Sequence, residues 1–356
     1  MEQKPVSQTM RNYILEQGIT MQQVIEHVPG EVEGVLQKIG RQYKRILLVG
    51  SGTSLNAAIA GKYVMEEYND CEVQVVTPFD FIHYFPEKRI TNDALVVGIS
   101  QTARSTGVID SIHRAREYGA RTLFLTAAPQ AAGAQCAESI LNTWTGDEFV
   151  GPKTKGFTST MAALFYLAAG LGGKSIDLTT IPGFISETIG SSEKVLPGFV
   201  DQFLAAPSLK IIGFGPNMAV AREGGLKALE TIRIPVEVYD VEEYMHGPYH
   251  CLEKDTYMIF IAPPGKGQER ILRLFQFADC ITSNTLVIGD EDLASTGRIK
   301  NLVPLPCNVD EMLTPLGYII PLQILANDIT LKKGRRPELS RYPNFHAMMG
   351  SKFTPQ

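Results

Sequence analysis

The chain has 356 residues, a hydrophobic content of 44% and a formal net charge of −5 at pH 7. This length is sufficient for about two domains on the usual scale of roughly 100 to 200 residues each, and the composition is typical of a globular protein. The mild acidic balance gives no electrostatic reason to expect nucleic acid or an anionic membrane as a partner.

Residues 1–44 precede the first predicted strand and are expected to form a helical segment. Four short apolar runs follow, each ending in a break that contains Gly, Ser, Thr or Pro and then in a helical stretch. The runs are RILLV (45–49), CEVQVV (71–76), ALVVGIS (94–100) and RTLFL (121–125). Their alternation with helices predicts a first α/β domain over residues 45–170, with a parallel sheet covered by helices on both faces.

The second half repeats this pattern after a helical connector at 171–208. Its apolar runs are LKIIGFG (209–215), PVEVYD (235–240), YMIFIAP (257–263) and TLVIGD (285–290). The centres of the four runs lie 164, 164, 163 and 164 residues after their counterparts, near 48, 74, 97 and 123. We therefore predict a tandem duplication of one doubly wound, flavodoxin-like domain, the second copy spanning 209–330, with a tail at 331–356 that has no counterpart.

The cysteines and the N-terminus indicate the compartment. Five cysteines, at 71, 136, 251, 280 and 307, are widely spaced and form no CxxC pair, so neither a disulfide framework nor a zinc site is predicted. The N-terminus has no apolar core behind a basic segment, and no apolar run approaches the roughly 20 residues of a membrane span. We expect a cytoplasmic protein that needs no metal or other cofactor.

Two loops in the first half carry hydroxyl groups. The first strand runs into GSGTSLNAA (50–58), which places Thr53 and Ser54 at the start of a helix, where the helix dipole favours an anion. The third strand ends in SQTARST (100–106). Because ligands of an open α/β sheet bind outside the carboxyl ends of its strands, we expect both loops to hold one phosphate group. Neither loop is a Walker or a GxGxxG motif.

Serine and threonine also cap helices throughout proteins, and either loop alone fits that structural role equally well. The repeat offers an internal comparison. The corresponding loops of the second copy, GFGPNMAV (213–220) and APPGKGQE (262–269), have lost most of the hydroxyls. Because a purely structural cap is expected in both copies, the difference favours a single anion site in the first domain.

Together these motifs resemble the double sugar-isomerase (SIS) domain family, which includes the isomerase half of glucosamine-6-phosphate synthase and stand-alone fructosamine and glucosamine 6-phosphate deglycases. Five further segments contribute to the resemblance, which extends over almost the whole chain. They are MRNYILEQ (10–17), GDEFVGPKTKGFTST (146–160), AREGGLKALE (221–230), EEYMHGPYH (242–250) and TPLGYIIPLQILANDITLKKG (314–334).

The resemblance implies which residues bind the substrate. The phosphate would be bound by Thr53, Ser54, Ser100, Gln101, Thr102 and Ser105, and the sugar would lie against Gly52, Gly151 and Lys153. The chain departs from the family at three positions. Ala103 stands where a glycine is usual, Arg104 where an acid or amide is usual, and Lys153 where a small residue is common.

Acid–base chemistry is expected from the predicted helix AREGGLKALETIRIP (221–235), which Pro235 ends. Glu223, Lys227 and Glu230 share one face of such a helix. On a solvated helix this spacing is only a stabilising charge pair, worth about 0.2–0.5 kcal/mol. Partly desolvated beside a lysine, a carboxylate is instead a suitable base for moving a proton between two carbons.

The resemblance assigns the proton transfer to Glu230, with Glu223 and Lys227 beside it. His246, in front of Gly247-Pro248, would open the sugar ring in the active site of a neighbouring subunit, which implies a homodimer or a larger homo-oligomer. A lone histidine in a turn is otherwise more often structural. Lys352 is the nearest candidate for a tail lysine that forms an imine with the sugar carbonyl, although a tail lysine is normally only solvated.

The expected reaction is a proton shift between C1 and C2 of a phosphorylated amino sugar or glycated amino acid, with release of the amine and formation of a hexose 6-phosphate. The chain begins Met1-Glu2 and lacks the N-terminal cysteine of the glutaminase domain, so we do not expect glutamine-dependent synthesis. Two alternatives remain: an aldose–ketose phosphosugar isomerase, and a sugar-phosphate sensor without enzyme activity.

Overall fold

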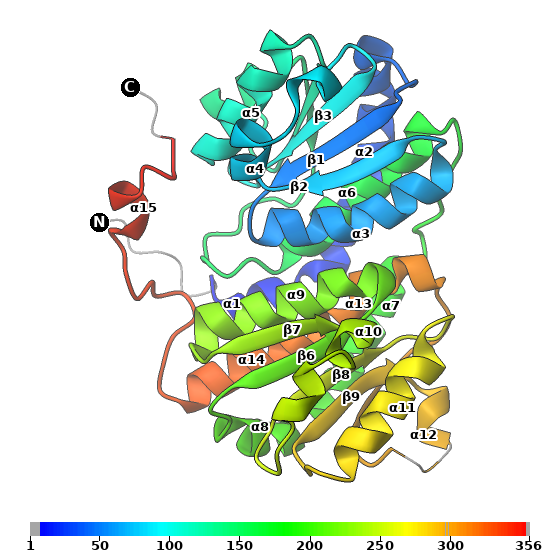
Figure 1. Ribbon diagram of the computed structural model, residues 1–356, viewed down its shortest axis with the longest axis vertical. Helices are drawn as coiled ribbons and strands as arrows, with labels where there is room; N and C mark the ends of the chain where they lie inside the picture. The colour runs from blue at the N-terminus through cyan, green and yellow to red at the C-terminus, as the bar shows by residue number, and fades with distance from the viewer. Residues whose placement is uncertain (1–7, 296, 298, 354–356) are drawn as a thin grey trace. The chain divides into compact units, whose positions relative to one another are not determined.

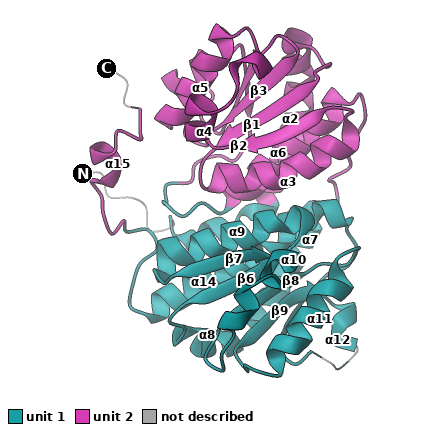
Figure 2. Cartoon of the chain, in the orientation of Figure 1, with its two compact units in different colours: residues 1–18, 149–154, 180–339 teal, residues 19–148, 155–179, 340–356 magenta. Residues whose placement is uncertain are grey.

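The computed structural model describes residues 8–295, 297 and 299–353. The outermost parts of the two predicted terminal segments, residues 1–7 and 354–356, lie outside the described residues. The chain folds into two compact units that interleave along the sequence (Figure 2). Unit 1 contains Met1–Gly18, Phe149–Thr154 and Thr180–Leu339, and unit 2 contains Ile19–Glu148, Lys155–Thr179 and Ser340–Gln356.

Unit 2 is built on a five-stranded parallel sheet in the order β2-β1-β3-β4-β5 (Figure 1). The strands are β1 (Arg45–Gly50), β2 (Glu72–Val76), β3 (Ala94–Ile99), β4 (Arg121–Thr126) and β5 (Ser139–Asn142). The α-helices in or entering this unit are α2 (Gln17–Ile39), α3 (Thr53–Tyr68), α4 (Pro78–His83), α5 (Thr106–Glu117), α6 (Lys155–Leu171) and α15 (Phe345–Met348). Two 3₁₀ turns, η1 (Glu87–Arg89) and η2 (Ala132–Cys136), complete it.

The central strands of unit 2 are apolar on both faces because helices cover the sheet on both sides. Every residue of β3 is buried. On one face α4 and α5 contribute Phe81, Val108 and Ile112 to a core with Leu47 and Phe124. Helices α3 and α6 pack against each other beside β1 and β2.

Unit 1 contains a second five-stranded parallel sheet, in the order β10-β9-β8-β6-β7. The strands are β6 (Leu209–Gly213), β7 (Val236–Asp240), β8 (Met258–Ala262), β9 (Thr285–Asp290) and β10 (Leu302–Leu305). Its α-helices are α1 (Met10–Leu15), α7 (Ile181–Val195), α8 (Pro197–Leu204), α9 (Met218–Lys227), α10 (Val241–Tyr244), α11 (Gln268–Asp279), α12 (Asp292–Ser295), α13 (Pro315–Tyr318) and α14 (Ile320–Lys332). Short turns are η3 (Gly215–Asn217), the π-helical η4 (Ala228–Ile232), η5 (Pro248–Cys251) and η6 (Glu311–Leu313).

The predicted duplication of a flavodoxin-like sheet is confirmed, since each copy has the strand order 2-1-3-4-5 of that fold. The eight predicted strands are present, and each sheet has a fifth strand that the prediction lacked. The two additional strands obey the same repeat, because β10 begins at Leu302, 163 residues after β5 begins at Ser139. Among the described helices, none combines the length and the apolarity that crossing a membrane requires.

Candidate active site

The two hydroxyl-rich loops of unit 2 leave neighbouring strands at the same edge of the sheet. In the parallel register between β1 and β3, Gly50 pairs with Ile99, so both strands end at one level. The first loop turns through Gly52, which has a φ of 57°, into the 16-residue helix α3. Thr53 and Ser54 are the first two residues of α3, where helical amides point toward the loop.

The second loop is a tight turn that the chain holds in an unfavourable conformation. The amide of Ala103 donates to the carbonyl of Ser100 at 3.0 Å, and Ala103 has a φ of 49°, a region that glycine normally occupies. The family usually has a glycine at position 103, and in this chain an alanine adopts the same positive-φ conformation. Ala103 is fully buried, and a Cβ on Gly133 would lie 2.1 Å from its carbonyl oxygen, so Gly133 has to be a glycine.

Neither of the two helices that begin at these loops is capped by the side chain of its N-cap residue. Gly52, the N-cap of α3, has no side chain that accepts a hydrogen bond, and Ser105, the N-cap of α5, makes no side-chain capping hydrogen bond. Ser100 is buried at the end of β3, whereas Thr102 is exposed. Helix capping by the N-cap side chain therefore does not explain the hydroxyl of Ser105.

The C-terminal tail pairs with the second loop inside unit 2. Ser105 and Lys352 form an antiparallel bridge, and the amide of Phe353 donates to the carbonyl of Arg104 at 2.7 Å. Arg104 Nε donates in turn to the carbonyl of Phe353 at 3.2 Å. Lys352, a predicted catalytic residue, is thus adjacent to the predicted phosphate residue Ser105. Lys352 is exposed as a whole, but partial desolvation of its ammonium group and, second, the positive charge of Arg104 lower the pKa of Lys352 below its usual range.

The predicted acid–base residues form one cluster in unit 1. Lys227 Nζ lies 3.2 Å from Glu223 Oε1 and 2.6 Å from Glu230 Oε2. Glu223 and Lys227 are fully buried, whereas the Glu230 side chain is 34% exposed. The desolvated carboxylate is therefore Glu223, and Glu230 is the member of the cluster that a ligand can reach.

Two glycines explain how charged residues come to be buried on α9. A Cβ on Gly224 would lie 2.2 Å from Leu322 of α14, and one on Gly225 would lie 2.8 Å from Val238 of β7. The Gly-Gly pair lets α9 approach α14 and the sheet closely enough to enclose the side chain of Lys227. A buried charge of this kind is tolerated only when it is paired.

The two glutamates determine the charge of Lys227. Burial alone would lower the pKa of Lys227, but the negative charges of Glu223 and Glu230 outweigh it and raise the pKa above the usual range. Lys227 is therefore an ammonium ion at any physiological pH. It orients the Glu230 carboxylate and does not act as a base.

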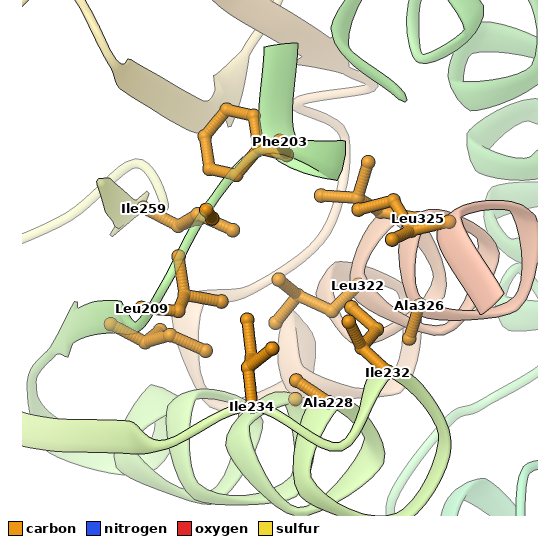
Figure 3. Close-up of a pocket in the computed structure, with 13 residues that line it drawn as sticks. Phe203, Leu209, Ala228, Ile232, Ile234, Ile259, Leu322, Leu325 and Ala326 are labelled. Atoms are coloured by element: carbon orange, nitrogen blue, oxygen red, sulfur yellow. The ribbon is translucent and has the colours of Figure 1, made fainter. Parts of the chain in front are cut away.

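The helix that carries this cluster ends differently from the prediction. It changes at Ala228 into a π turn and stops at Arg233, which has a φ of 63°, two residues before Pro235. Such π turns are rare and occur frequently at functional sites. Ala228 and Ile232 of the turn line an apolar cavity of about 10 Å³ whose other labelled walls are aliphatic or aromatic (Figure 3). This void is too small for a ligand. The apolar side chains around it pack against Ala228 and Ile232 and hold the π turn in place.

His246 lies in unit 1 on an exposed turn between α10 and η5. Asp240 caps α10 by accepting a hydrogen bond from the amide of Glu242 at 2.8 Å, and buried Tyr244 anchors the helix in the core. Gly247 has a φ of 126°, which only glycine adopts readily, so the Gly-Pro pair fixes the chain immediately after the histidine. Short helices therefore flank His246 on both sides, and the turn between them leaves the histidine exposed.

The remaining predicted residues and one unpredicted residue follow β5 along the chain. Gly151 and Lys153 belong to the segment of unit 1 at 149–154. The prediction did not single out Glu148, a buried carboxylate whose Oε2 accepts a hydrogen bond from Gln101 Nε2 at 3.1 Å. The described residues contain no group of three or more His, Cys, Asp or Glu side chains placed to hold a metal ion.

Comparison with known proteins shows what the chain is similar to. Residues 41–169 match the family model of the SIS domain. The glutamine–fructose-6-phosphate aminotransferase (isomerizing) of Gloeobacter violaceus is 28% identical over 314 residues, which cover 85% of this chain and 51% of the relative. The chain thus spans about half the length of the curated relatives it matches.

Solved structures extend the likeness to both copies of the fold. The C-terminal domain of glucosamine-fructose-6-phosphate aminotransferase from Francisella tularensis superposes with a TM-score of 0.82 at 20% identity, covering 95% of this chain and 99% of that domain. Glucosamine-6-phosphate deaminase from Thermotoga maritima gives 0.73 at 19% identity, covering 93% and 98%. At these identities the likeness establishes the fold.

Proposed function

We propose that this chain, which carries a SIS domain in its first half and repeats the fold in its second, is an enzyme acting on a phosphorylated amino sugar or glycated amino acid. It shifts a proton between C1 and C2 and releases the amine to leave a hexose 6-phosphate. The observation that carries the proposal is the buried Lys227 with Glu230 at its open side, 2.6 Å from Nζ. A permanently charged lysine that orients one reachable carboxylate suits proton transfer at carbon.

The proposal assigns a task to each part of the site. Thr53, Ser54 and the Ser100–Ser105 loop bind the phosphate with hydroxyls and amides, aided by the N-terminus of α3. Gly52, Gly151 and Lys153 lie against the sugar. Glu230 carries the proton, and Glu223 balances the charge of Lys227.

The chemistry balances without an external oxidant or cofactor. For a 1-amino-1-deoxy ketose 6-phosphate, Glu230 takes a proton from C1, the electron pair forms the C1–C2 double bond, and the C2 carbonyl oxygen takes a proton from water to give an enaminol. Return of the proton at C2 leaves a C1 imine. Water adds to the imine carbon, the C–N bond breaks with its electrons on nitrogen, and the products are the amine and an aldose 6-phosphate. Glu230 gains one proton from C1 and returns it at C2, while water supplies the proton on the C2 oxygen and takes the proton that nitrogen loses when the imine forms.

A small panel of substrates tests this function. Purified protein is incubated with glucosamine 6-phosphate, fructoselysine 6-phosphate, glucoselysine 6-phosphate and fructose 6-phosphate, and hexose phosphate and amine are measured. We expect amine release from at least one amino sugar. Interconversion of hexose phosphates without amine release would favour an aldose–ketose isomerase instead, and binding without turnover would favour a sensor.

We expect Lys352 to react with acetic anhydride at a lower pH than an ordinary surface lysine. Only the neutral amine is acylated, and a lowered pKa leaves more neutral amine at a given pH. Mass spectrometry of the labelled peptides follows Lys352 against exposed Lys88 of the same unit, and Arg104→Gln should move the Lys352 profile to higher pH. If Lys352 and Lys88 are acylated over the same pH range, the support for an imine role is lost. Borohydride trapping in the presence of substrate tests the imine directly.

The proposal places His246 in the active site of a second copy of this chain, where it opens the sugar ring. We expect His246→Ala and Glu230→Gln proteins each to be inactive, and mixed dimers of the two to regain one working site of two. In such a dimer one site combines an intact Glu230 with an intact His246 of the partner subunit. If both residues acted within one chain, mixing would restore nothing, and refolding each variant alone is the control.

A further inference from the structure

A buried glutamate fixes the second hydroxyl-rich loop from behind. Glu148 follows β5 and is only 7% exposed. Its Oε2 accepts hydrogen bonds from Gln101 Nε2 at 3.1 Å and from the amide of Gly156 at 3.0 Å. Gly156 is the second residue of α6, so the carboxylate lies at a helix N-terminus, where its negative charge is stabilised. Glu148 thereby ties the loop after β3 to the long helix α6.

The Gln101 side chain has room for this bond only because residue 156 is a glycine. A Cβ there would lie 2.3 Å from Gln101 Nε2. The Gln101 main chain is held as well, since its carbonyl accepts from Thr126 Oγ1 and from the amide of Ala127, both at 3.0 Å. The residue is fixed at both ends, two positions before the strained Ala103. Strained turns persist only where the surroundings over-determine them, and these contacts supply that restraint.

The second copy has a corresponding glutamate that hydrogen-bonds to the corresponding loop. The sequence DEFVGP at 147–152 recurs as DEMLTP at 310–315, again 163 residues later. Glu311 Oε2 accepts a hydrogen bond from the amide of Lys266 at 3.3 Å, and a Cβ on Gly265 would lie 2.2 Å from the same oxygen. Gly265 lies 164 residues after Gln101, the offset that separates β3 from β8. In both copies a glutamate after the fifth strand fixes the loop after the third.

We propose that Glu148 is a positioning residue that keeps the Ser100–Ser105 loop in the shape that binds the sugar phosphate. Glu311 performs the same mechanical task on a loop that binds no phosphate. This inference rests on the proposed function, since it takes the first loop to be the phosphate site. It also supplies a matched pair of residues. Glu148 is expected to affect loop structure and ligand binding, and Glu311 loop structure alone.

Glu148→Gln and Glu311→Gln test the proposal side by side. Each replaces a charged carboxylate with a neutral amide, which weakens the hydrogen bonds that the side-chain oxygen accepts, so each loosens its own loop. We expect Glu148→Gln to weaken binding of fructose 6-phosphate, measured by calorimetry, by about tenfold or more, and Glu311→Gln to change it less than twofold. Equal weakening in both variants, or none in either, would overturn the proposal.

Hydrogen exchange without ligand separates this inference from the function on which it rests. Glu148→Gln should speed exchange at the amides of Ala103 and Ala127, and Glu311→Gln at the amide of Lys266. If the unaltered protein binds none of the panel's sugar phosphates, the proposed function fails while the exchange data still judge the loop restraint. Unchanged exchange at the amides of Ala103 and Ala127 in Glu148→Gln would refute the loop restraint. Should Glu148→Gln unfold, Gly156→Ala displaces Gln101 instead and is expected to give the same local loosening.

Discussion

Replacement of Glu230 by glutamine is expected to lower kcat by about 10²- to 10⁴-fold, the usual contribution of a positioned general base. The amide oxygen of glutamine still accepts from Lys227 Nζ, so the geometry of the cluster is kept while the ability to take a proton is lost. Binding of the sugar phosphate should be unchanged, since the substitution leaves the hydroxyls and amides of the phosphate loops unaltered. Steady-state kinetics and calorimetry measure the two quantities separately.

Glu237→Gln is the matched control. Glu237 also pairs with a lysine, Lys210, in the same unit, and its side chain is 49% exposed. We expect this variant to retain full turnover. If Glu230→Gln kept its activity, or if both variants lost it equally, Glu230 would not be the base.

Lys227→Met is expected to reduce the free energy of unfolding by about 3–5 kcal/mol, the usual cost of removing one partner from a buried ion pair. The fully buried Glu223 would be left without the ammonium ion 3.2 Å away. Methionine fills most of the lysine volume, so the loss reports the charge rather than a cavity. Urea denaturation followed by circular dichroism measures it.

Two further variants check that the charge is responsible. Lys210→Met removes a lysine whose partner Glu237 is half exposed, and it should cost only about 0–1 kcal/mol. The double variant Lys227→Met with Glu223→Gln should recover much of the lost stability, because no charge then remains buried. An equal loss in Lys210→Met, or no recovery in the double variant, would contradict this account.

The fold was predictable where burial leaves a strong pattern. The central strands lie between two layers of helices, so they appear in the sequence as continuous apolar runs. The two missed strands are edge strands of four residues, SILN in β5 and LVPL in β10. Pro304 in β10 also argues against a strand, although proline is tolerated at an edge.

The cluster of Glu223, Lys227 and Glu230 was predictable from spacing, but its local geometry was not. Spacing placed Glu223, Lys227 and Glu230 on one face of a helix, as the structure has them, yet it did not distinguish the buried carboxylate from the reachable one. That distinction depends on Gly224 and Gly225, which bring α14 and β7 close to α9. The π turn and the positive φ of Arg233 arise from tertiary packing and leave no periodic signal.

Glu148 was missed because a single glutamate in a loop is an ordinary observation. Its signal was the recurrence of Asp-Glu and a proline at a fixed offset in the other half of the chain. Comparing the two halves residue by residue, rather than strand by strand, reveals it.

Glu148 and Glu311 also indicate the order in which features of the chain arose during evolution. A feature present at equivalent positions of both copies, Glu148 and Glu311, is most simply inherited from the single ancestral domain that was duplicated. The hydroxyls of the SQTARST loop, by contrast, are present in only one copy. On the proposal that these glutamates restrain their loops, the restraint is older than the divergence of the two loop sequences.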